Sequence, residues 1–479
     1  FEEALRRETA GWREQLDRVT LELPADGADL AATVRANLGY ILVNRDGPAI
    51  QPGSRAYDRS WIRDGALTSA ALIRLGHGDA AASFAEWFAG YQFASGRVPC
   101  CVDGRGADPV PEHDSHGELV YLIAEVVRSS GDLEFARRMW PHVAAATDAI
   151  DALRAERRTV AEEAPARLRF WGLLPESISH EGYSDRPVHS YWDDCWGIRG
   201  LEDGAWLANR LGLADDAARL GAAAAEMRRE VVASMTRVMA EEGVEYLPAS
   251  ADLADFDPTS TTVAVAPLGL QPWLPARALE TTFWRYLAES RQRAAGTRQW
   301  DAYTPYELRT VGTLVRLGWR DAAWEMLRFF LADRRPAGWR QWAEVVGREP
   351  RAPRFLGDMP HTWCGSDFIR SALDLLAWED GDRLVLAAGV PAEWTNPGER
   401  VVVSGLVTRF GPLSYRMASE PDRVVVTIDA VRETPPGGVL VKAPGLTAAT
   451  NVTVNGRVAA VVDGGVAVTE LPAVVVIGR

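Results

Sequence analysis

The sequence of 479 residues lacks the features that mark membrane proteins and nucleic-acid-binding proteins. It contains no run of about 18 apolar residues, which is the length that a membrane span requires. Its 66 acidic residues outnumber its 52 basic residues, and the net charge of −14 disfavours an anionic partner. No Gly-rich phosphate-binding loop and no nucleophile-elbow motif appear either. We therefore expect no membrane span and no nucleic-acid partner.

Cysteine is also scarce, with four residues in the whole chain. Cys100 and Cys101 are adjacent, which is a strained arrangement for a disulfide between them. None of the four, which include Cys195 and Cys364, has the spacing of a zinc site. We expect free or packed thiols and predict no cofactor. The first residues, FEEALRRETAGW, contain no initiating Met and no signal-peptide pattern, so the sequence leaves the localisation open, and likewise the oligomeric state.

The stretch HDSHGE raises the question of a metal, because His113, Asp114, His116 and Glu118 are of metal-binding types. Their spacing is not that of a closed zinc site, and no second cluster of ligands is obvious. We therefore predict no metal here. Substrate hydrogen bonding by His116 and capping of the next helix by Asp114 or Ser115 are the favoured interpretations.

Apolar residues recur with a helical period through most of the chain. A charged amphipathic segment, 2–18, stands before the rest like a linker helix. Twelve further periodic segments follow at 27–43, 64–76, 79–92, 115–129, 133–157, 189–211, 215–241, 258–269, 275–294, 304–317, 320–334 and 365–378.

The connections between these segments alternate between long and short. The short ones, such as LGHGD and LGWRD, are typical of turns between antiparallel helices. The six long ones lie near 44–63, 93–114, 158–188, 242–257, 295–303 and 335–364. Six helical hairpins closed into a ring would bring all the long loops to one end. The sequence thus predicts a mainly α fold, an (α/α)6 toroid barrel with one working face.

After about residue 380 the pattern changes to Val alternating with polar residues, broken by Gly, Pro and Asn-Gly turns. This pattern predicts a small antiparallel β-domain of sandwich type. We therefore divide the chain into a linker helix (1–24), a barrel that carries the catalytic residues (25–380) and a β-sandwich-like domain (381–479).

The long loops hold aromatic and acidic residues at unusual density, and the chain has 18 Trp. The first loop ends in YDRSWIRDG, which contains Tyr57, Asp58, Trp61, Arg63 and Asp64. Such a stretch suits one wall of a pocket for a polar, ring-shaped ligand, because a Trp can stack on the apolar face of a sugar. Arg63 and Asp64 look like a clamp for hydroxyl groups. An internal ion pair, with Asp64 capping the next helix, is the alternative.

Two carboxylates in these loops are candidates for acid and base in glycoside hydrolysis, which in inverting enzymes needs a pair about 6.5–9.5 Å apart. Glu176 in LLPESISHEG follows an apolar stretch and is our candidate acid, with Glu181 as its competitor. Glu344 in GWRQWAEVV is our candidate base, because Trp residues flank it and an Arg lies nearby. Asp301 and Asp358 are the alternatives for the base.

The helix that begins in HSYWDDCWG can turn only one of two pairs to the pocket, His189 with Asp193 or Tyr191 with Asp194. The further candidate substrate contacts are aromatic, charged or histidine residues of the long loops: His116, His180, Glu181, Tyr191, Trp192, Asp193, Trp300, Asp301, Trp339, Arg340, Trp342, His361 and Trp363.

The order of linker helix, twelve-helix barrel and β-domain resembles the (α/α)6-barrel glycosidases, a group that includes glucoamylase, trehalase, processing α-glucosidase and the α-L-rhamnosidases. WIRDG is similar to the Trp-x-Arg-Asp segment with which several of them hold the terminal sugar. LLPES with HSYWDD resembles the acid-bearing region of the α-glucosidase branch, and GWRQWAEVV with GDMPHTWCGSD the base-bearing stretch of the rhamnosidase branch. The resemblance implies Glu176 as acid, Glu344 as base, and Arg63 and Asp64 as sugar ligands.

The expected function is therefore an exo-acting, inverting glycoside hydrolase acting on an oligo- or polysaccharide. A phosphorylase or a polysaccharide lyase on the same toroid, and a carbohydrate-binding scaffold without activity, remain alternatives. The sequence leaves the sugar, the linkage and the anomeric configuration open.

Overall fold

A computed structural model of the chain describes residues 1–351 and 354–479. Six helical segments form an inner ring: α3 (Ile62–Arg74), α5 (Asp114–Ser130), α7 (Tyr191–Leu211), the short α9 (Pro258–Thr261) with the 3-10 turn Thr262–Ala264, α11 (Arg309–Arg316) and α13 (Thr362–Leu376). Each segment contacts the next one around the ring, and α13 contacts α3, so the ring closes.

Six outer helices surround the ring: α2 (Ala28–Asn44), α4 (Gly78–Ala89), α6 (Leu133–Ala155), α8 (Ala214–Glu242), α10 (Ala276–Ala294) and α12 (Arg320–Ala332). The pattern of buried residues differs between the inner and the outer helices. Every residue of α13 is buried, whereas α8 buries one stripe that includes Leu220, Met227 and Val231. This is the difference expected between a helix that is apolar all round and an amphipathic one. The predicted (α/α)6 barrel is confirmed.

Two glycines let the inner helices α5 and α7 approach closely. A Cβ atom on Gly117 would lie 2.0 Å from the carbonyl oxygen of Trp196, and a Cβ atom on Gly200 would lie 2.7 Å from the Cα of Gly117. Neither contact leaves room for a side chain, so the ring is tightest at this pair of helices.

The segment 258–269 differs from its prediction as one continuous helix. It forms only α9 and the 3-10 turn after it, a total of seven residues. Pro267 has no N–H for the helical ladder and disfavours helical backbone in the residue before it. Gly269 then takes a left-handed conformation at φ 69°. The inner helical segment at this position is therefore shorter than predicted.

The chain after α13 forms two sheets, and the N-terminal segment adds the edge strand β1 to the larger one. The larger one has the strand order β1 (Thr20–Glu22), β9 (Arg400–Thr408), β10 (Gly411–Ser419), β11 (Arg423–Ile428), β17 (Ala473–Gly478), β13 (Val452–Val454) and β14 (Arg457–Ala459). The smaller one has the order β15 (Val461–Val462), β16 (Gly465–Val468), β12 (Val439–Val441), β8 (Arg383–Leu386) and β7 (Ala377–Asp380).

The predicted antiparallel β-domain is confirmed, with one parallel pair in it. β8 and β12 run in the same direction, because the chain crosses to the larger sheet between them and returns. β7 starts at Ala377, directly after α13, so the smaller sheet begins a few residues before the boundary that the composition indicated. Alternate residues of β10 are buried, which gives the sheet one core face.

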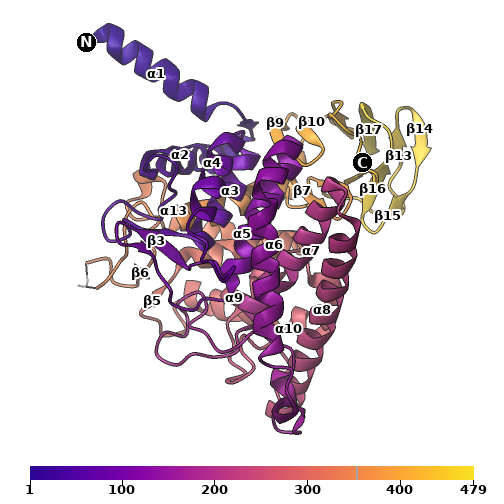
Figure 1. Ribbon diagram of the computed structural model, residues 1–479. Coiled ribbons are helices and arrows are strands. Elements are labelled where there is room, and N and C mark those ends of the chain that lie inside the picture. Colours follow the sequence, from indigo (N-terminus) through magenta and orange to yellow (C-terminus); the bar gives the residue numbers. More distant parts are fainter. Residues whose placement is uncertain (352–353) are drawn as a thin grey trace.

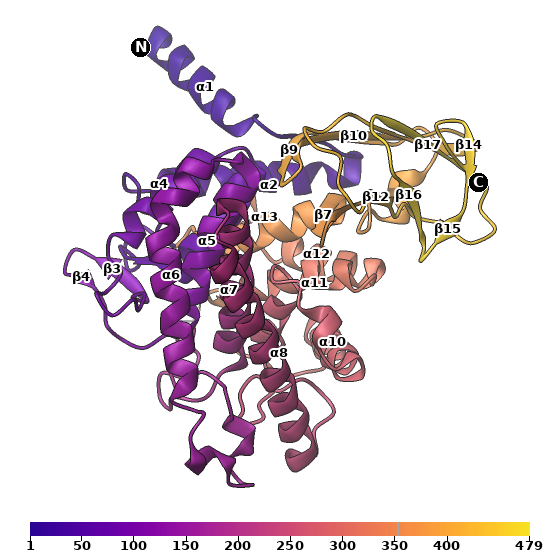
Figure 2. The same cartoon turned by 45° about the vertical axis from the view of Figure 1, so that its right-hand side comes forward.

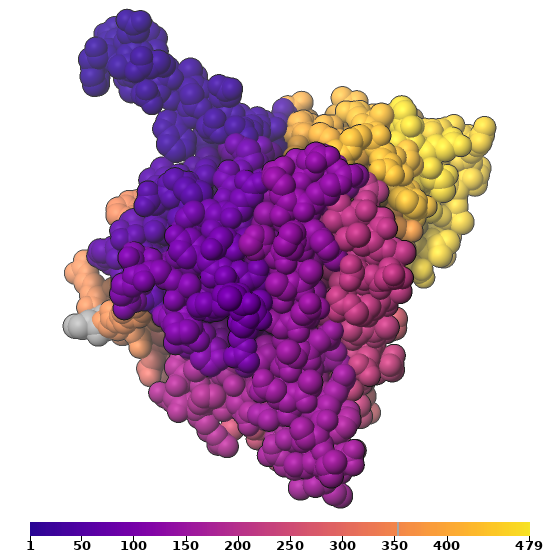
Figure 3. Space-filling view, in the orientation of Figure 1, coloured from indigo at the N-terminus to yellow at the C-terminus, as the bar shows by residue number. Residues whose placement is uncertain are grey.

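The N-terminal segment contributes both a helix and a strand. α1 (Glu2–Leu16) has no buried residue and projects from the body of the molecule in both ribbon views (Figure 1, Figure 2) and as a separate rod in Figure 3. β1 follows it and pairs with β9, with Thr20 opposite Ser404. The predicted linker thus supplies an edge strand to the sheet of the C-terminal domain.

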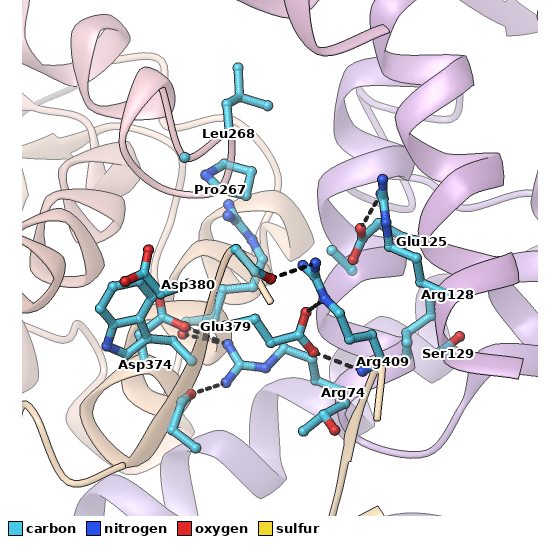
Figure 4. Close-up of a pocket in the computed structure, with 18 of the residues that line it drawn as sticks. Arg74, Glu125, Arg128, Ser129, Pro267, Leu268, Asp374, Glu379, Asp380 and Arg409 are labelled. Carbon is cyan, nitrogen blue, oxygen red and sulfur yellow. Dashed lines mark hydrogen bonds and ion pairs between the residues drawn. The ribbon is translucent and has the colours of Figure 1, made fainter. Parts of the chain in front are cut away.

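Arginines in the last turns of α3 and α11 bind the end of the inner helix α13, from which the chain enters the β-domain. Arg74 at the end of α3 and Arg316 at the end of α11 both bind the buried Asp374, at 2.6 and 3.0 Å. Arg409 of the β-domain pairs with Glu379 of β7 (Figure 4). These residues surround a cavity of about 220 Å³. The positive charge of an arginine is favourable at a helix C-terminus, where carbonyl groups lack hydrogen-bond partners. The arginines and the acidic residues that bind them close this end of the barrel.

The opposite ends of the inner helices, where each helix begins, carry the long loops. The small strands β3 (Cys101–Asp103) and β4 (Gly106–Ala107) belong to these loops and lie away from the β-domain (Figure 1, Figure 2). No helix within residues 1–351 and 354–479 is long and apolar enough to cross a bilayer.

Candidate active site

A pocket of about 380 Å³ opens where the inner helices begin. Five of the six long loops supply its walls, and the loop of β3 and β4 lies behind it. The lining residues are Pro52, Tyr57, Trp61, Arg63, Asp64, His180, Glu181, Gly182, Asp257, Thr259, Ser260, Thr304, Tyr306, Arg309, Glu344, His361 and Trp363.

The pocket brings together nine residues that the sequence singled out. They are Tyr57, Trp61, Arg63, Asp64, His180, Glu181, Glu344, His361 and Trp363. The other candidates do not line it: Asp58, His116, Glu176, Tyr191, Trp192, Asp193, Trp300, Asp301, Trp339, Arg340 and Trp342.

Two tyrosines hold the carboxylate of Glu344 in the pocket. The hydroxyl of Tyr57 donates to one of its oxygens, and the hydroxyl of Tyr306 donates to the other at 2.8 Å. Burial, followed by the interaction with Glu344, raises the pKa of Tyr57 far above its ordinary value. Burial likewise raises the pKa of Tyr306. Both phenols therefore stay protonated, and Glu344 is placed as an acceptor.

The backbone around Glu344 is fixed by neighbouring loops. β6 (Val346–Gly347) follows it and pairs with β5 (Ala302–Tyr303) of the preceding long loop. Gly357, at φ 72°, lies so close that a Cβ atom there would be 2.6 Å from a carboxylate oxygen of Glu344. A glycine is required because it combines the left-handed conformation with this close approach.

Glu181 lies at the rim of the same pocket, with its side chain 50% exposed. The indole Nε1 of Trp61 donates to its carboxylate at 3.2 Å, and Nη2 of Arg63 lies 4.0 Å away. Glu181 and Ser179 both have left-handed backbone, at φ 61° and 52°. Such strained conformations persist only where surrounding contacts enforce them, and they are frequent at functional sites.

His180, which stands between Ser179 and Glu181 in the sequence, makes contacts that hold these two residues in place. Its Nδ1 is 3.0 Å from the Ser179 hydroxyl, and its Nε2 is 2.8 Å from the Ser260 hydroxyl. Its ring stacks on Trp192, with the ring centroids 4.7 Å apart. Burial lowers the pKa of His180 to about 3, so the imidazole is neutral at physiological pH. His180 thus lines the pocket and also fixes the loop that carries Glu181.

Residues of α7 support this loop from behind. Asp193 is buried and accepts hydrogen bonds from the Ser177 and Ser179 hydroxyls, both at 2.6 Å. Trp192 Nε1 donates to Asp114 at 2.7 Å. The hydroxyls of Tyr191 and Ser234 lie 2.7 Å apart behind the pocket. The start of α7 therefore acts on the pocket through the loop of Glu181.

Arg63 and Asp64 form part of the floor of the pocket, and both are buried. Arg63 pairs with Glu112, lies 3.6 Å from Asp64, and has its guanidinium carbon 5.0 Å from the ring centre of Trp363. Burial raises the pKa of Asp64 to about 8, against the opposing effect of Arg63. At neutral pH Asp64 is therefore largely a carboxylic acid, which can both donate to and accept from a hydroxyl group.

Glu176 lies outside the pocket. Its carboxylate pairs with Arg157 and is 3.6 Å from Nε2 of His189, which in turn binds Asp252. Burial acts to raise the pKa of Glu176, but hydrogen bonds and the nearby positive charges hold that pKa below its ordinary value. A carboxylate held in this way stays ionised and does not reach the pocket.

The two alternatives for the base also have other surroundings. The carboxylate of Asp358 accepts from the backbone N–H groups of Arg55, Ala56 and Tyr57 at 2.7, 3.0 and 3.1 Å, and so pins the first long loop. Asp301 lies with Trp300 at a separate cavity of about 390 Å³. Neither residue lines the pocket of Glu344.

Four further candidates lie outside the pocket. Trp342 is buried and donates to the Phe330 carbonyl at 3.1 Å. Arg340 pairs with Asp29 on the outer helix α2, and Trp339 is exposed. His116 is buried at the start of α5 and lies beside the carbonyl of His113.

The sequence missed several lining residues, among them Asp257, Ser260, Tyr306 and Arg309. Asp257 caps the short helix α9 by accepting from the N–H groups of Thr259 and Ser260. The capping pattern in FDPTS was a usable signal. Tyr306 and Arg309 carried no such signal, because their role depends on the packing of α11 against α13.

Comparisons with known proteins place this geometry in a known fold. No protein-family model and no curated protein sequence matches the chain. An α-L-rhamnosidase from Dictyoglumus thermophilum is similar with a TM-score of 0.61 at 8% identity, over 96% of this chain and 50% of the rhamnosidase. The Streptomyces avermitilis α-L-rhamnosidase complexed with L-rhamnose has a TM-score of 0.60 at 14% identity, over 96% of this chain and 42% of the rhamnosidase.

A glycosidase variant solved in complex with glucose has a TM-score of 0.51 at 18% identity, over 74% of this chain and 98% of that glycosidase. At these identities the similarity concerns the fold. The chain spans half or less of the two rhamnosidases but nearly all of the glycosidase. This protein therefore has the (α/α)6-barrel fold of the glycosidases and α-L-rhamnosidases.

Proposed function

We propose that the protein is an inverting glycoside hydrolase in which Glu344 is the general base and Glu181 the general acid. The observation that carries this proposal is the presence of these two carboxylates in one pocket with Arg63 and Asp64. Glu181 replaces Glu176 in the role of the acid, because Glu176 lies outside that pocket in an ion pair.

The surroundings of Glu344 support its role as base. Two protonated tyrosines donate to its oxygens and keep the carboxylate oriented. An oriented carboxylate can take a proton from a water molecule that attacks the anomeric carbon. The same two donors disfavour a phosphorylase, which needs room and positive charge for phosphate at this place.

The position of Glu181 supports its role as acid. It lies at the rim of the pocket, where the leaving group of a terminal sugar would sit. Its exposed carboxylate is accessible to the glycosidic oxygen of a bound substrate. Trp61, which binds Glu181, and Tyr57, which binds Glu344, have ring centroids 5.7 Å apart. The proposed inverting mechanism requires a separation of about 6.5–9.5 Å between the two carboxylates, which leaves room for the attacking water.

The floor of the pocket supports recognition of a single terminal sugar. Arg63 and Asp64 offer donors and acceptors to vicinal hydroxyl groups, and Trp363 offers an aromatic face. The barrel core closes the pocket below these residues, which favours exo action. The sugars in the similar structures, glucose and L-rhamnose, are the first glycosides to test.

Three matched Glu→Gln variants test the proposal. In a turnover screen over α- and β-glucosides and α-L-rhamnosides, we expect Glu344→Gln and Glu181→Gln to lose about 10²–10⁴-fold or more in kcat. Glu176→Gln, five residues from Glu181 but outside the pocket, should keep most of the activity. Proton NMR of the first product released should show the inverted anomer.

Other outcomes would assign the site differently. Loss of activity in Glu176→Gln with retention in Glu181→Gln would restore Glu176 as acid. Retention in Glu344→Gln would exclude it as base. Sugar binding by the wild type without any turnover would favour a carbohydrate-binding scaffold.

A further inference from the structure

Two adjacent thiols lie directly behind the wall of the pocket. Cys101 begins β3, which pairs with β2 (Ser60–Trp61), and Cys100 precedes it. Their sulfur atoms are 3.1 Å apart, and both residues are buried. Asp108 follows β4, and one ligand atom from each of the three residues lies within 4.8 Å of the other two. Within residues 1–351 and 354–479, this is the one group of three such ligands so close together.

The geometry suits chelation better than a disulfide. Adjacent Cα atoms across a trans peptide are about 3.8 Å apart, whereas disulfides usually join Cα atoms about 4.4–6.8 Å apart. Successive side chains in an extended strand point to opposite faces. Cys100 and Cys101 instead direct both sulfurs to one place, where Asp108 adds an oxygen.

A positive charge already occupies the surroundings of this cluster. Nη1 of Arg59 is 3.5 Å from the Cys101 sulfur and 3.7 Å from the Asp108 carboxylate. The same guanidinium binds Asp103 at 2.8 Å, and the Arg59 side chain is partly exposed. Arg59 can therefore withdraw from the sulfur and remain paired with Asp103. The cluster would then present two sulfurs and a carboxylate without a counter-charge.

We propose that Cys100, Cys101 and Asp108 bind one thiophilic divalent metal ion of the zinc and cadmium type. Thiolates select such soft ions over magnesium and calcium. Binding releases the two thiol protons to solvent and displaces Arg59. Two sulfurs on one tetrahedral zinc at about 2.3 Å each are about 3.8 Å apart, so the pair needs to open only slightly from its present separation. A water molecule completes the four-coordinate site.

The proposed metal site would adjoin the wall of the pocket at Trp61. This residue packs against both cysteines, and its backbone pairs with Cys101 across β2 and β3. Its indole donates to Glu181 at the rim of the pocket. The metal site is nonetheless defined by its own ligands, and its test needs neither a substrate nor the proposed hydrolase activity.

Cadmium binding to the reduced full-length chain tests the proposal. We expect one Cd²⁺ per chain by calorimetry, with the ultraviolet charge-transfer band of cadmium thiolate. Cys101→Ser and Cys100→Ser should each weaken binding at least about tenfold and reduce the band. Cys195→Ser is the matched control, because that thiol is buried in α7 outside the cluster, and it should bind as the wild type does.

Two partly exposed residues give a test that does not depend on replacing a buried thiol. Asp108→Asn should weaken cadmium binding about tenfold. Arg59→Gln should tighten it, because the competing guanidinium is removed. The proposal is overturned if the reduced wild type shows no cadmium-thiolate band, or if the band persists unchanged in Cys101→Ser. It is also overturned if Cys100 and Cys101 join as a disulfide, seen as a loss of two hydrogens by mass, in the purified protein after dialysis against zinc without reductant.

Discussion

At the scale of single residues, the pocket combines groups whose protonation is set by burial. Asp64 is held largely protonated at neutral pH, and His180 and His361 are held neutral because burial lowers the pKa of each to about 3. Glu344 receives two hydrogen bonds from phenols. Burial thereby leaves Asp64, His180 and His361 uncharged at neutral pH, in a pocket that also contains Arg63, Arg309 and the side chains of Glu181, Asp257 and Glu344.

The raised pKa of Asp64 makes the stability of the protein depend on pH. The folded state keeps the Asp64 proton up to about pH 8, whereas the unfolded chain releases it near pH 4. The free energy of unfolding should therefore fall between these pH values, by at most about 1.4 kcal/mol per pH unit from this group. In Asp64→Asn that contribution is absent, so the decline should be shallower.

Urea unfolding at pH 5 and pH 7.5 measures this difference. Asp58→Asn is a suitable control, since Asp58 precedes the same helix but is not buried. Equal pH dependence in the wild type and in Asp64→Asn would show that Asp64 ionises in the folded state as it does in the unfolded chain.

At the scale of elements, the loop of Glu181 is shaped by contacts with α7 and α9 and not by its own sequence preferences. Ser179 and Glu181 adopt the left-handed backbone conformation, which residues other than glycine rarely adopt. Asp193 of α7 binds two serines of this loop, and Ser260 of α9 binds His180. The position of Glu181 therefore depends on two inner helices far apart in sequence.

Replacement of Asp193 should release this loop without opening the barrel. Asp193→Ala removes the acceptor for the Ser177 and Ser179 hydroxyls. The buried Ser177 hydroxyl loses its acceptor at a cost of about 1–3 kcal/mol, whereas the Ser179 hydroxyl keeps Ser190 and His180 as neighbours. We expect faster hydrogen exchange in residues 176–190 and a lower kcat, with little change in KM. Tyr191→Phe, on the same helix but bound to Ser234, should leave the exchange of the loop unchanged.

An unaltered exchange pattern in Asp193→Ala would argue against this account. It would mean that the stacking of His180 on Trp192 is sufficient to fix the loop.

At the scale of the whole molecule, the two ends of the barrel serve different purposes. The beginnings of the inner helices bear the loops that form the pocket. The C-terminal ends of α3 and α11 carry arginines that bind Asp374 near the end of α13, next to the β-domain. Arg74 and Asp374 are seen in Figure 4. The N-terminal segment also takes part in the larger sheet, because its strand β1 pairs with β9.

Asp374 is the residue on which two of these arginines converge. Asp374→Asn should leave Arg74 and Arg316 without their anionic partner and lower the free energy of unfolding by about 3 kcal/mol. Asp380→Asn is the control. Asp380 pairs with the neighbouring Arg383 in the β7–β8 hairpin, and a partly exposed pair of this kind contributes at most about 1 kcal/mol. Equilibrium unfolding followed by circular dichroism would measure both values, and equal effects would count against a special role for Asp374.

The sequence by itself determined the helices, their order and the character of the β-domain. Helical periodicity and the alternation of long and short connections are local properties, so they survive without knowledge of the tertiary structure. The inner helix that departed most from its prediction is the one interrupted at Pro267. The α-helix α11 also begins five residues later than predicted, after a 3-10 turn at Pro305–Leu308. The edge strand β1 was not foreseen, because three residues carry too little pattern to predict a pairing with a strand nearly 400 residues later.

The tertiary structure decided which residues of the loops meet. Glu176 and Glu181 stand five residues apart with similar neighbours in sequence, yet only Glu181 lines the pocket, while Arg157 and His189 hold the other away from it. Trp342 and Trp363 likewise belong to the same long loop, and one is in the core while the other lines the pocket. The physical reason is that a loop has no period of its own. Its side chains are directed by hydrogen bonds and packing from other helices, and those partners become known only when the ring is closed.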